Sequence, residues 1–128
     1  MQTGSIFKRI LLIQDDAPNA EAIADALNNS CDVSFQVDWV RNCSVGLDRL
    51  AGTAAILLDL FLPDSRGIET FKRLFRAAPH IPILILVDLQ DEQTAKLAVQ
   101  LGAQDYLLRR CRRPLVKAVT AALADPYA

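Results

Sequence analysis

The stretch AAILLDLFLPDSRG, residues 54–67, decides the fold. Residues 54–58 are all apolar, which is typical of a strand buried on both faces of a parallel sheet. Asp59 follows directly, and the segment after it contains Pro63 and Gly67, which interrupt a strand. A carboxylate at this point lies at the carboxyl end of a buried strand, where open α/β sheets form their ligand crevice. We therefore expect Asp59 to belong to a functional site.

A second pair of acids ends another apolar run. The residues ILLIQ, 10–14, precede Asp15 and Asp16. If the two strands are neighbours, three carboxylates meet at one edge of the sheet and repel each other. A hard cation such as Mg2+, which prefers oxygen ligands, would join them. The sequence therefore predicts a Mg2+ site made by Asp15, Asp16 and Asp59, and with it phosphoryl chemistry.

Apolar runs of strand length alternate with helical patterns along the chain. The expected strands span residues 10–13, 33–40, 54–60, 83–87 and 106–108, and the expected helices span residues 18–27, 45–50, 68–78, 91–101 and 114–123. This alternation predicts an α/β protein with a flavodoxin-like (βα)5 fold, a doubly wound parallel sheet in the strand order 2-1-3-4-5. That order makes the first and third strands neighbours and brings the three acids to one crevice. The second helix is expected to carry its apolar stripe on Val45, Leu47 and Leu50.

Composition and charge exclude several classes of function. The 128 residues match one ordinary domain, and a hydrophobic share of 52% suffices for a core on both faces of a sheet. Lys and Arg number 14 against 15 Asp and Glu, so the net charge of -1 gives no general attraction to nucleic acid or to an anionic membrane. No apolar run is long enough to cross a bilayer. We therefore expect a cytoplasmic protein that binds neither nucleic acid nor membrane.

Three motifs together resemble the receiver domain of two-component response regulators. They are LLIQDD at 11–16, LLDLFLPDSRG at 57–67 and LGAQDYLL at 101–108. The resemblance covers nearly the whole chain, so residues 1–128 are expected to form a single receiver-like domain, on its own or within a larger multidomain signalling protein. It implies that Asp59 is the phosphoacceptor and that Tyr106 is the switch aromatic of the family. It also implies a Mg2+ site whose ligands are Asp15, Asp16, Asp59 and the backbone carbonyl of Phe61.

Three positions depart from the family pattern. Val87 stands where a Ser or Thr contacts the phosphoryl group, Arg109 stands where a Lys precedes a Pro, and Asp88 stands where a small residue is expected. Val87 has no hydrogen-bond donor, whereas the guanidinium of Arg109 can still pair with phosphate. Asp88 adds negative charge beside a site that would accept about -1.5 to -2 more. The candidates for phosphate contact or switching are therefore Val87, Asp88, Tyr106 and Arg109.

The leading interpretation is a receiver domain of a two-component phosphorelay. It accepts a phosphoryl group on Asp59 with Mg2+ and signals through protein contacts. Its partners would be a sensor histidine kinase or phosphotransfer protein and an output domain. The alternative is a pseudo-receiver, an interaction module that signals without phosphorylation, and the three departures favour it. A small hydrolase would need a second general acid, and a nucleotide binder would need a glycine-rich loop after the first strand. The chain is therefore not expected to be an enzyme.

Four arginines surround Cys111 in the segment RRCRR, residues 109–113. Such a cluster is usually a solvated loop, although it can also bind an acidic partner or phosphate. If the protein forms a homodimer, we expect the face of the fourth helix, fifth strand and fifth helix to be used. These arginines could then pair with Asp88, Asp91 and Glu92 across a two-fold axis.

Overall fold

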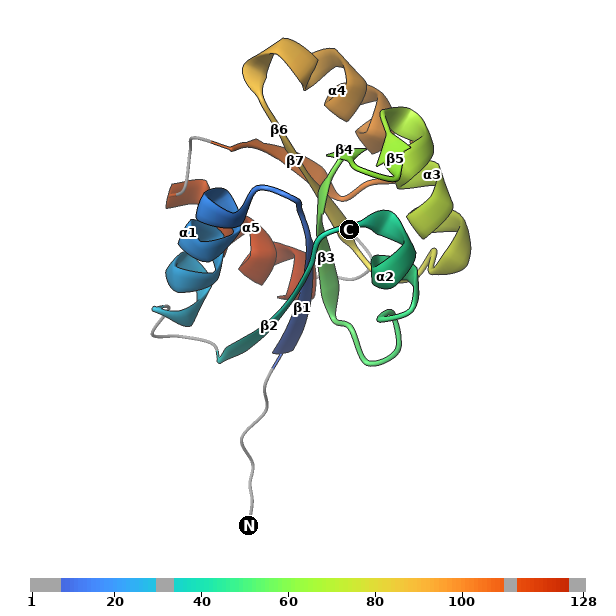
Figure 1. Cartoon of the computed structure of the whole chain (residues 1–128). Coiled ribbons are helices and arrows are strands. Elements are labelled where there is room, and N and C mark those ends of the chain that lie inside the picture. The colour runs from blue at the N-terminus through green and yellow to red at the C-terminus, as the bar shows by residue number, and fades with distance from the viewer. Residues whose placement is uncertain (1–7, 30–33, 110–112, 125–128) are drawn as a thin grey trace.

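The computed structural model describes residues 8–29, 34–109 and 113–124 and has a parallel sheet at its centre (Figure 1). The strands of this sheet are β1 (Lys8–Ile13), β2 (Phe35–Val40), β3 (Ala55–Asp59), β6 (Ile83–Val87) and β7 (Asp105–Leu108). They lie in the order β2-β1-β3-β6-β7, and each neighbouring pair is parallel. This is the predicted order 2-1-3-4-5, so the flavodoxin-like fold is confirmed.

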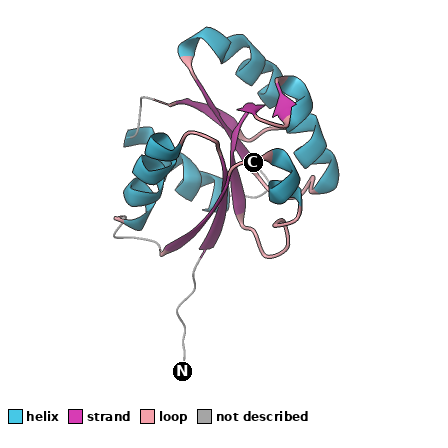
Figure 2. Ribbon diagram, viewed as in Figure 1, coloured by secondary structure: helices cyan, strands magenta, loops and turns pink. Residues whose placement is uncertain are grey.

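Helices cover both faces of the sheet (Figure 2). One face carries α1 (Ala17–Asn28) and α5 (Arg113–Ala124), and the other carries α2 (Cys43–Leu47), α3 (Ile68–Ala77) and α4 (Glu92–Leu101). Each face has its own cluster of buried apolar side chains. Because successive residues of a strand point to opposite faces, Leu11 and Ile13 of β1 belong to one cluster and Ile10 and Leu12 to the other. None of the helices in the described ranges is long and apolar enough to cross a membrane.

Capping residues fix the ends of the helices near the predicted site. Asp16 is the N-cap of α1, and its Oδ1 accepts the backbone N–H of Asn19 at 3.2 Å. A short 3-10 helix, η1 (Leu89–Asp91), leads from β6 to α4. Gly102 ends α4 with a φ of 132°, which favours glycine. A Cβ at this position would lie 2.6 Å from Cζ of Phe75, so the glycine also allows α3 and α4 to approach closely.

The prediction for the second helix was wrong in its bounds and at Val45, whereas Leu47 and Leu50 pack against the core as predicted. The helix α2 is Cys43–Leu47, and it buries Cys43 and Gly46 while Val45 is exposed. Its N-cap is Asn42, whose Oδ1 accepts the N–H of Val45 at 2.8 Å, and the two carboxylate oxygens of Asp64 accept the N–H groups of Cys43 at 2.8 Å and Ser44 at 2.9 Å. The helix therefore begins two residues earlier than its apolar spacing suggests.

The segment after Asp59 forms a small antiparallel hairpin that the sequence did not predict. Its strands are β4 (Phe61–Leu62) and β5 (Ser65–Arg66). The predicted strand start at Val33 and the arginine cluster at 110–112 lie outside the described residues. The proposed pairing of these arginines with Asp91 and Glu92 therefore remains a prediction.

Candidate functional site

The predicted site residues lie at the edge of the sheet where β1, β3, β6 and β7 end, here called the carboxyl edge. Asp59 is the last residue of β3, and Val87 is the last residue of β6. Arg109 follows β7 directly, and its backbone N–H donates to the carbonyl of Val87 at 2.9 Å. Ile13 of β1 is opposite Leu58 of β3, so Asp59 is level with the next residue of the first strand, Gln14.

Asp59 is held in a buried, polar position. The residue is 5% exposed, its Oδ1 accepts the N–H of Phe61 at 2.9 Å, and its Oδ2 lies 3.5 Å from Nη1 of Arg109. Burial raises the pKa of Asp59, and the Phe61 N–H, Arg109 and Gln14 offset only part of this effect. A buried strand-end acid with a shifted pKa, facing a cation, is typical of a reactive group.

Arg109 joins three carboxylates at the carboxyl edge. Its Nη2 lies 2.9 Å from Oδ2 of Asp16, and its Nη1 lies 3.5 Å from Asp59 and 3.7 Å from Asp88. The side chain of Arg109 is only 19% exposed, so these pairs are partly shielded from water. A planar guanidinium suits this role because its five N–H donors can face several carboxylates at once.

Asp15 and Asp16 occupy different environments. One oxygen of Asp16 caps α1 and the other pairs with Arg109, so both are engaged. Asp15 is exposed, and the cation nearest to it is Nη1 of Arg41, 3.9 Å from its Oδ1. Arg41 in turn lies 4.9 Å from the ring centroid of Trp39, where a cation–π interaction is favourable. Both side chains are about half exposed, but Asp15 is the less engaged of the two predicted ligands.

The sequence reasoning missed Gln14. The residue is fully buried, and neither Oε1 nor Nε2 has a hydrogen-bond partner among the described residues. Its side chain lies close enough to Asp59 to lower the pKa of that acid, but the two groups make no well-aligned hydrogen bond. The available signal was a polar residue between an apolar run and an acidic pair.

Some of the predicted Mg2+ ligands are free to bind a metal ion and one is not. Among residues 8–29, 34–109 and 113–124, no group of three or more His, Cys, Asp or Glu side chains is arranged to hold a metal ion. Asp16 pairs with Arg109 and caps α1, and the predicted Mg2+ site remains a prediction. Asp15, Asp59 and the carbonyl of Phe61 are the oxygen groups that remain. Mg2+ usually keeps several waters and takes one or two protein carboxylates together with phosphate oxygens, so this smaller set fits it.

The aromatic residue on β7 is tied to α4. The hydroxyl of Tyr106 donates to Oε2 of Glu92 at 2.6 Å, and this hydrogen bond raises the pKa of Tyr106. Val87, which lies between this region and Asp59, is 2% exposed and offers no polar atom on its side chain. The structure thus brings Asp16, Asp59, Asp88 and Arg109 together, while Tyr106 makes its polar contact at α4.

A family model for the response regulator receiver domain matches residues 10–120. The chain belongs to this family. The transcriptional regulatory protein QseB of Haemophilus influenzae is similar, with 34% identity over 105 residues that cover 79% of this chain and 45% of QseB. The swarming motility regulation protein RssB of Serratia marcescens is 31% identical over 121 residues, which cover 90% of this chain and 54% of RssB. The receiver domain thus spans about half the length of these curated relatives.

Solved structures agree with this membership. Full-length FixJ from B. japonicum superposes with a TM-score of 0.82 at 27% identity, over 94% of this chain and 59% of that protein. A receiver domain protein from Clostridium thermocellum gives a TM-score of 0.80 at 22% identity, over 91% and 94% of the two chains. The chain is therefore a response regulator receiver domain, a component of two-component signalling.

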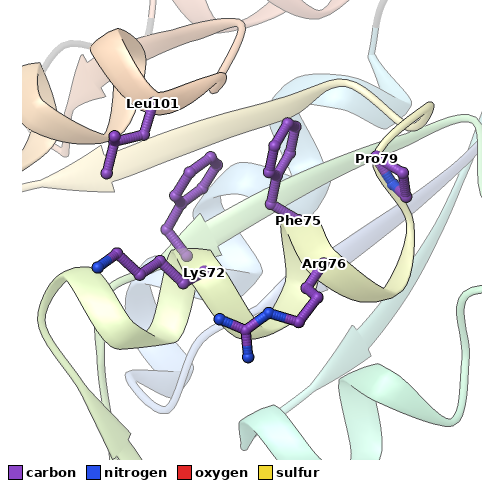
Figure 3. Close-up of a pocket in the computed structure, with 6 residues that line it drawn as sticks. Lys72, Phe75, Arg76, Pro79 and Leu101 are labelled. Carbon is purple, nitrogen blue, oxygen red and sulfur yellow. The ribbon is translucent and has the colours of Figure 1, made fainter.

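The receiver domain also has a cavity away from the carboxyl edge (Figure 3). Its volume is about 370 Å³, and it lies between α3 and the end of α4. The lining residues are Phe71, Lys72, Phe75, Arg76, Pro79 and Leu101. The rings of Phe71 and Phe75 stack with their centroids 5.2 Å apart. None of these residues contacts Asp59 or Arg109 in the described hydrogen bonds and ion pairs, so this cavity is separate from the predicted phosphorylation site.

Proposed function

We propose that this receiver domain accepts a phosphoryl group on Asp59 and signals through the contacts that this change alters. The observation that supports the proposal is the buried Asp59 at the carboxyl end of β3, facing Arg109 at 3.5 Å. One carboxylate oxygen of Asp59 would form the new bond to phosphorus. The bond from phosphorus to the leaving group of the donor would break, and the leaving group would keep the electron pair.

The residues around Asp59 would position the reacting group. The N–H of Phe61 holds one carboxylate oxygen at 2.9 Å, which fixes the direction of the other. Arg109 faces that second oxygen and would stabilise the negative oxygens of the transferred group, since guanidinium–phosphate pairs are strong. Mg2+, held by Asp15, Asp59 and the carbonyl of Phe61, would supply further neutralisation of charge when it is bound. In this scheme Asp16 orients Arg109, instead of serving as a metal ligand.

The second candidate function is a pseudo-receiver that signals without phosphorylation. Two observations favour it. Val87 provides no hydroxyl for the phosphoryl group, and Arg109 already pairs with three acids, so part of the charge that a metal would neutralise is balanced within the protein. The two functions differ in one respect that can be measured, because only the first requires a modification of Asp59.

We propose a histidine kinase or a phosphotransfer protein as the phosphoryl donor and an output domain as the receiver's downstream partner. The support comes from QseB and RssB, which are named as regulatory proteins and are about twice as long as the matched region. A homodimer through α4, β7 and α5 is the contact that we propose between copies. The bond between Tyr106 and Glu92 lies within this face and would be altered by a change in α4.

The single tryptophan offers a direct test of metal and ligand binding. The Nε1–H of Trp39 donates to the backbone carbonyl of Gln14 at 2.8 Å, and Arg41 lies between Trp39 and Asp15. We expect the fluorescence of Trp39 to change on addition of Mg2+, and to change again on addition of beryllofluoride, a phosphoryl mimic.

Matched variants separate the two predicted metal ligands. Asp15→Asn should abolish the Mg2+ response, whereas Asp16→Asn should reduce it only slightly because that carboxylate faces Arg109. Asp59→Asn should abolish the beryllofluoride response. If wild type and Asp59→Asn respond equally to beryllofluoride, the pseudo-receiver is the better description of this chain.

A further inference from the structure

We propose that Gln14 donates a hydrogen bond from its Nε2 to the phosphoryl group on Asp59, and so supplies the donor that Val87 lacks. This inference rests on the proposed phosphorylation of Asp59. Gln14 is fully buried, and both polar atoms of its side chain are without a hydrogen-bond partner among the described residues. A buried, unpaired amide next to the phosphoacceptor is well placed to gain a hydrogen-bond partner when Asp59 is phosphorylated.

Both backbone polar groups of Gln14 are held by residues of β2. Its N–H donates to the carbonyl of Val40 at 3.0 Å, and its own carbonyl accepts the indole N–H of Trp39 at 2.8 Å. Gln14 is also level with Asp59 across the parallel pair of β1 and β3, because Ile13 is opposite Leu58. The side chain therefore starts from a fixed point beside the phosphoacceptor and needs only rotamer changes to reach a group bound there.

The unpaired amide is costly to the free domain. A buried donor or acceptor without a partner destabilises the folded state, whereas an apolar side chain of similar shape does not. Nothing in the packing of the strand requires an amide here, because the four preceding residues of β1 are apolar and fully buried. A ligand that accepts a hydrogen bond from Nε2 would remove the cost, and a phosphoryl group brings such oxygens.

The other nearby donors are already engaged or missing. The N–H of Phe61 donates to Oδ1 of Asp59, and the guanidinium of Arg109 is divided between three acids. Val87 has no donor. Gln14 also carries no charge, so it does not repel an added dianion as the carboxylate of Asp88 does. Gln14 and Val87 lie on opposite sides of β3, so the amide would reach the phosphoryl group from the β1 side and supply a donor without occupying the position of the absent hydroxyl.

Gln14→Met tests the proposal because methionine keeps the length of the side chain and removes the donor. The affinity for beryllofluoride is measured by 19F NMR in the presence of Mg2+, with Asp59→Asn as the control for site occupancy. We expect Gln14→Met to bind beryllofluoride about tenfold or more weakly than wild type, as the loss of a hydrogen bond to a charged group implies. We also expect its melting temperature without ligand to be higher than that of wild type, since the unpaired amide is gone.

Val87→Thr provides the complementary variant. If Gln14 replaces the missing hydroxyl, the loss caused by Gln14→Met should be several-fold smaller when Thr is present at position 87. Equal beryllofluoride affinity for wild type and Gln14→Met would overturn the role of Gln14 and leave the proposed phosphorylation standing. A lower melting temperature for Gln14→Met would also count against the proposal, because it would mean that the amide is satisfied in the free domain. Absence of beryllofluoride binding by wild type would overturn both proposals.

Discussion

Replacement of Arg109 by Met should destabilise the domain through the charge left on Asp59. In the structure Nη1 of Arg109 lies 3.5 Å from Oδ2 of Asp59, whose side chain is only 6% exposed. The two other carboxylates that contact Arg109, those of Asp16 and Asp88, have side chains that are 46% and 49% exposed. Water can solvate the charges of these two carboxylates when Arg109 is removed. The loss of stability therefore depends mainly on the buried charge of Asp59.

The magnitude follows from the burial of this pair. Two unit charges 3.5 Å apart attract by about 5 kcal/mol at an effective dielectric constant of about 20. Removal of one member of a fully buried pair costs about 3–5 kcal/mol. Because Arg109 is 19% exposed and its pair with Asp59 is longer than a good hydrogen bond, we expect a loss of about 2–3 kcal/mol in the free energy of unfolding at neutral pH. The pairs with Asp16 and Asp88 should add less than about 1 kcal/mol.

The destabilisation by Arg109→Met should depend on pH, and the direction of this dependence can be checked. Arg109 lowers the pKa of Asp59, which burial has raised, so the variant should raise that pKa further. When the pKa of an acid is higher in the folded state than in the unfolded state, the protein loses stability as the pH rises from the unfolded pKa through the folded pKa. The difference between wild type and Arg109→Met should therefore be small in acid, where Asp59 is protonated, and should grow toward neutral pH.

The free energy of unfolding in urea, measured at several pH values, tests this prediction. Arg49→Met is a matched control, because Nη1 of Arg49 lies 2.9 Å from the carboxylate of Asp38, which keeps a second partner in Arg9. The control should lose less than about 1 kcal/mol. In an Asp59→Asn background the loss from Arg109→Met should also fall below about 1 kcal/mol. A loss of 2–3 kcal/mol that persists in that background would refute the reasoning, since Asp59 would then not be its source.

Asp59→Asn alone should raise the free energy of unfolding at neutral pH, because burial raises the pKa of Asp59, and the gain should vanish as the pH falls below the ordinary value of 3.8. Gly102→Ala should lower it by more than about 1 kcal/mol, since its φ is 132° and a Cβ would lie 2.6 Å from the ring of Phe75; an unchanged urea midpoint would contradict this. In amide NMR spectra, beryllofluoride should perturb signals near Asp59 but leave those near Tyr106 little changed in wild type. Val87→Thr should extend the perturbation to Tyr106, and large shifts there in wild type would show that another residue performs the coupling.

The sheet could be predicted from the sequence because each long strand is marked by its own side chains. The residues of β3 and β6 are uninterrupted apolar runs, and all of them are buried in the structure. Such short runs are typical of strands covered on both faces, and the right-handed crossover rule then leaves few strand orders. Hydrogen bonds between segments far apart in sequence were harder to foresee. The start of α2 is held by its N-cap Asn42 and also by Asp64, which lies 21 positions away from Cys43.

The site was predicted in part for the same reason. The position of Asp59 at a strand end follows from the apolar run before it, and its neighbours follow from the strand order. The separate roles of Asp15 and Asp16 do not follow from adjacency in sequence, since both are exposed but only Asp16 caps α1 and pairs with Arg109. The burial of Gln14 depends on the register of β1 against β3, which residue types alone do not reveal.

Phosphorylation of Asp59 is the central claim, and incubation with isotope-labelled acetyl phosphate tests it most directly. Wild type, Asp59→Asn and Asp15→Asn are treated with and without Mg2+, and the label retained on the folded protein is counted. We expect wild type to be labelled in a manner that requires Mg2+, Asp59→Asn to remain unlabelled, and Asp15→Asn to be labelled weakly. No label on wild type, or equal label on wild type and Asp59→Asn, would contradict the assignment of Asp59 as the phosphoacceptor.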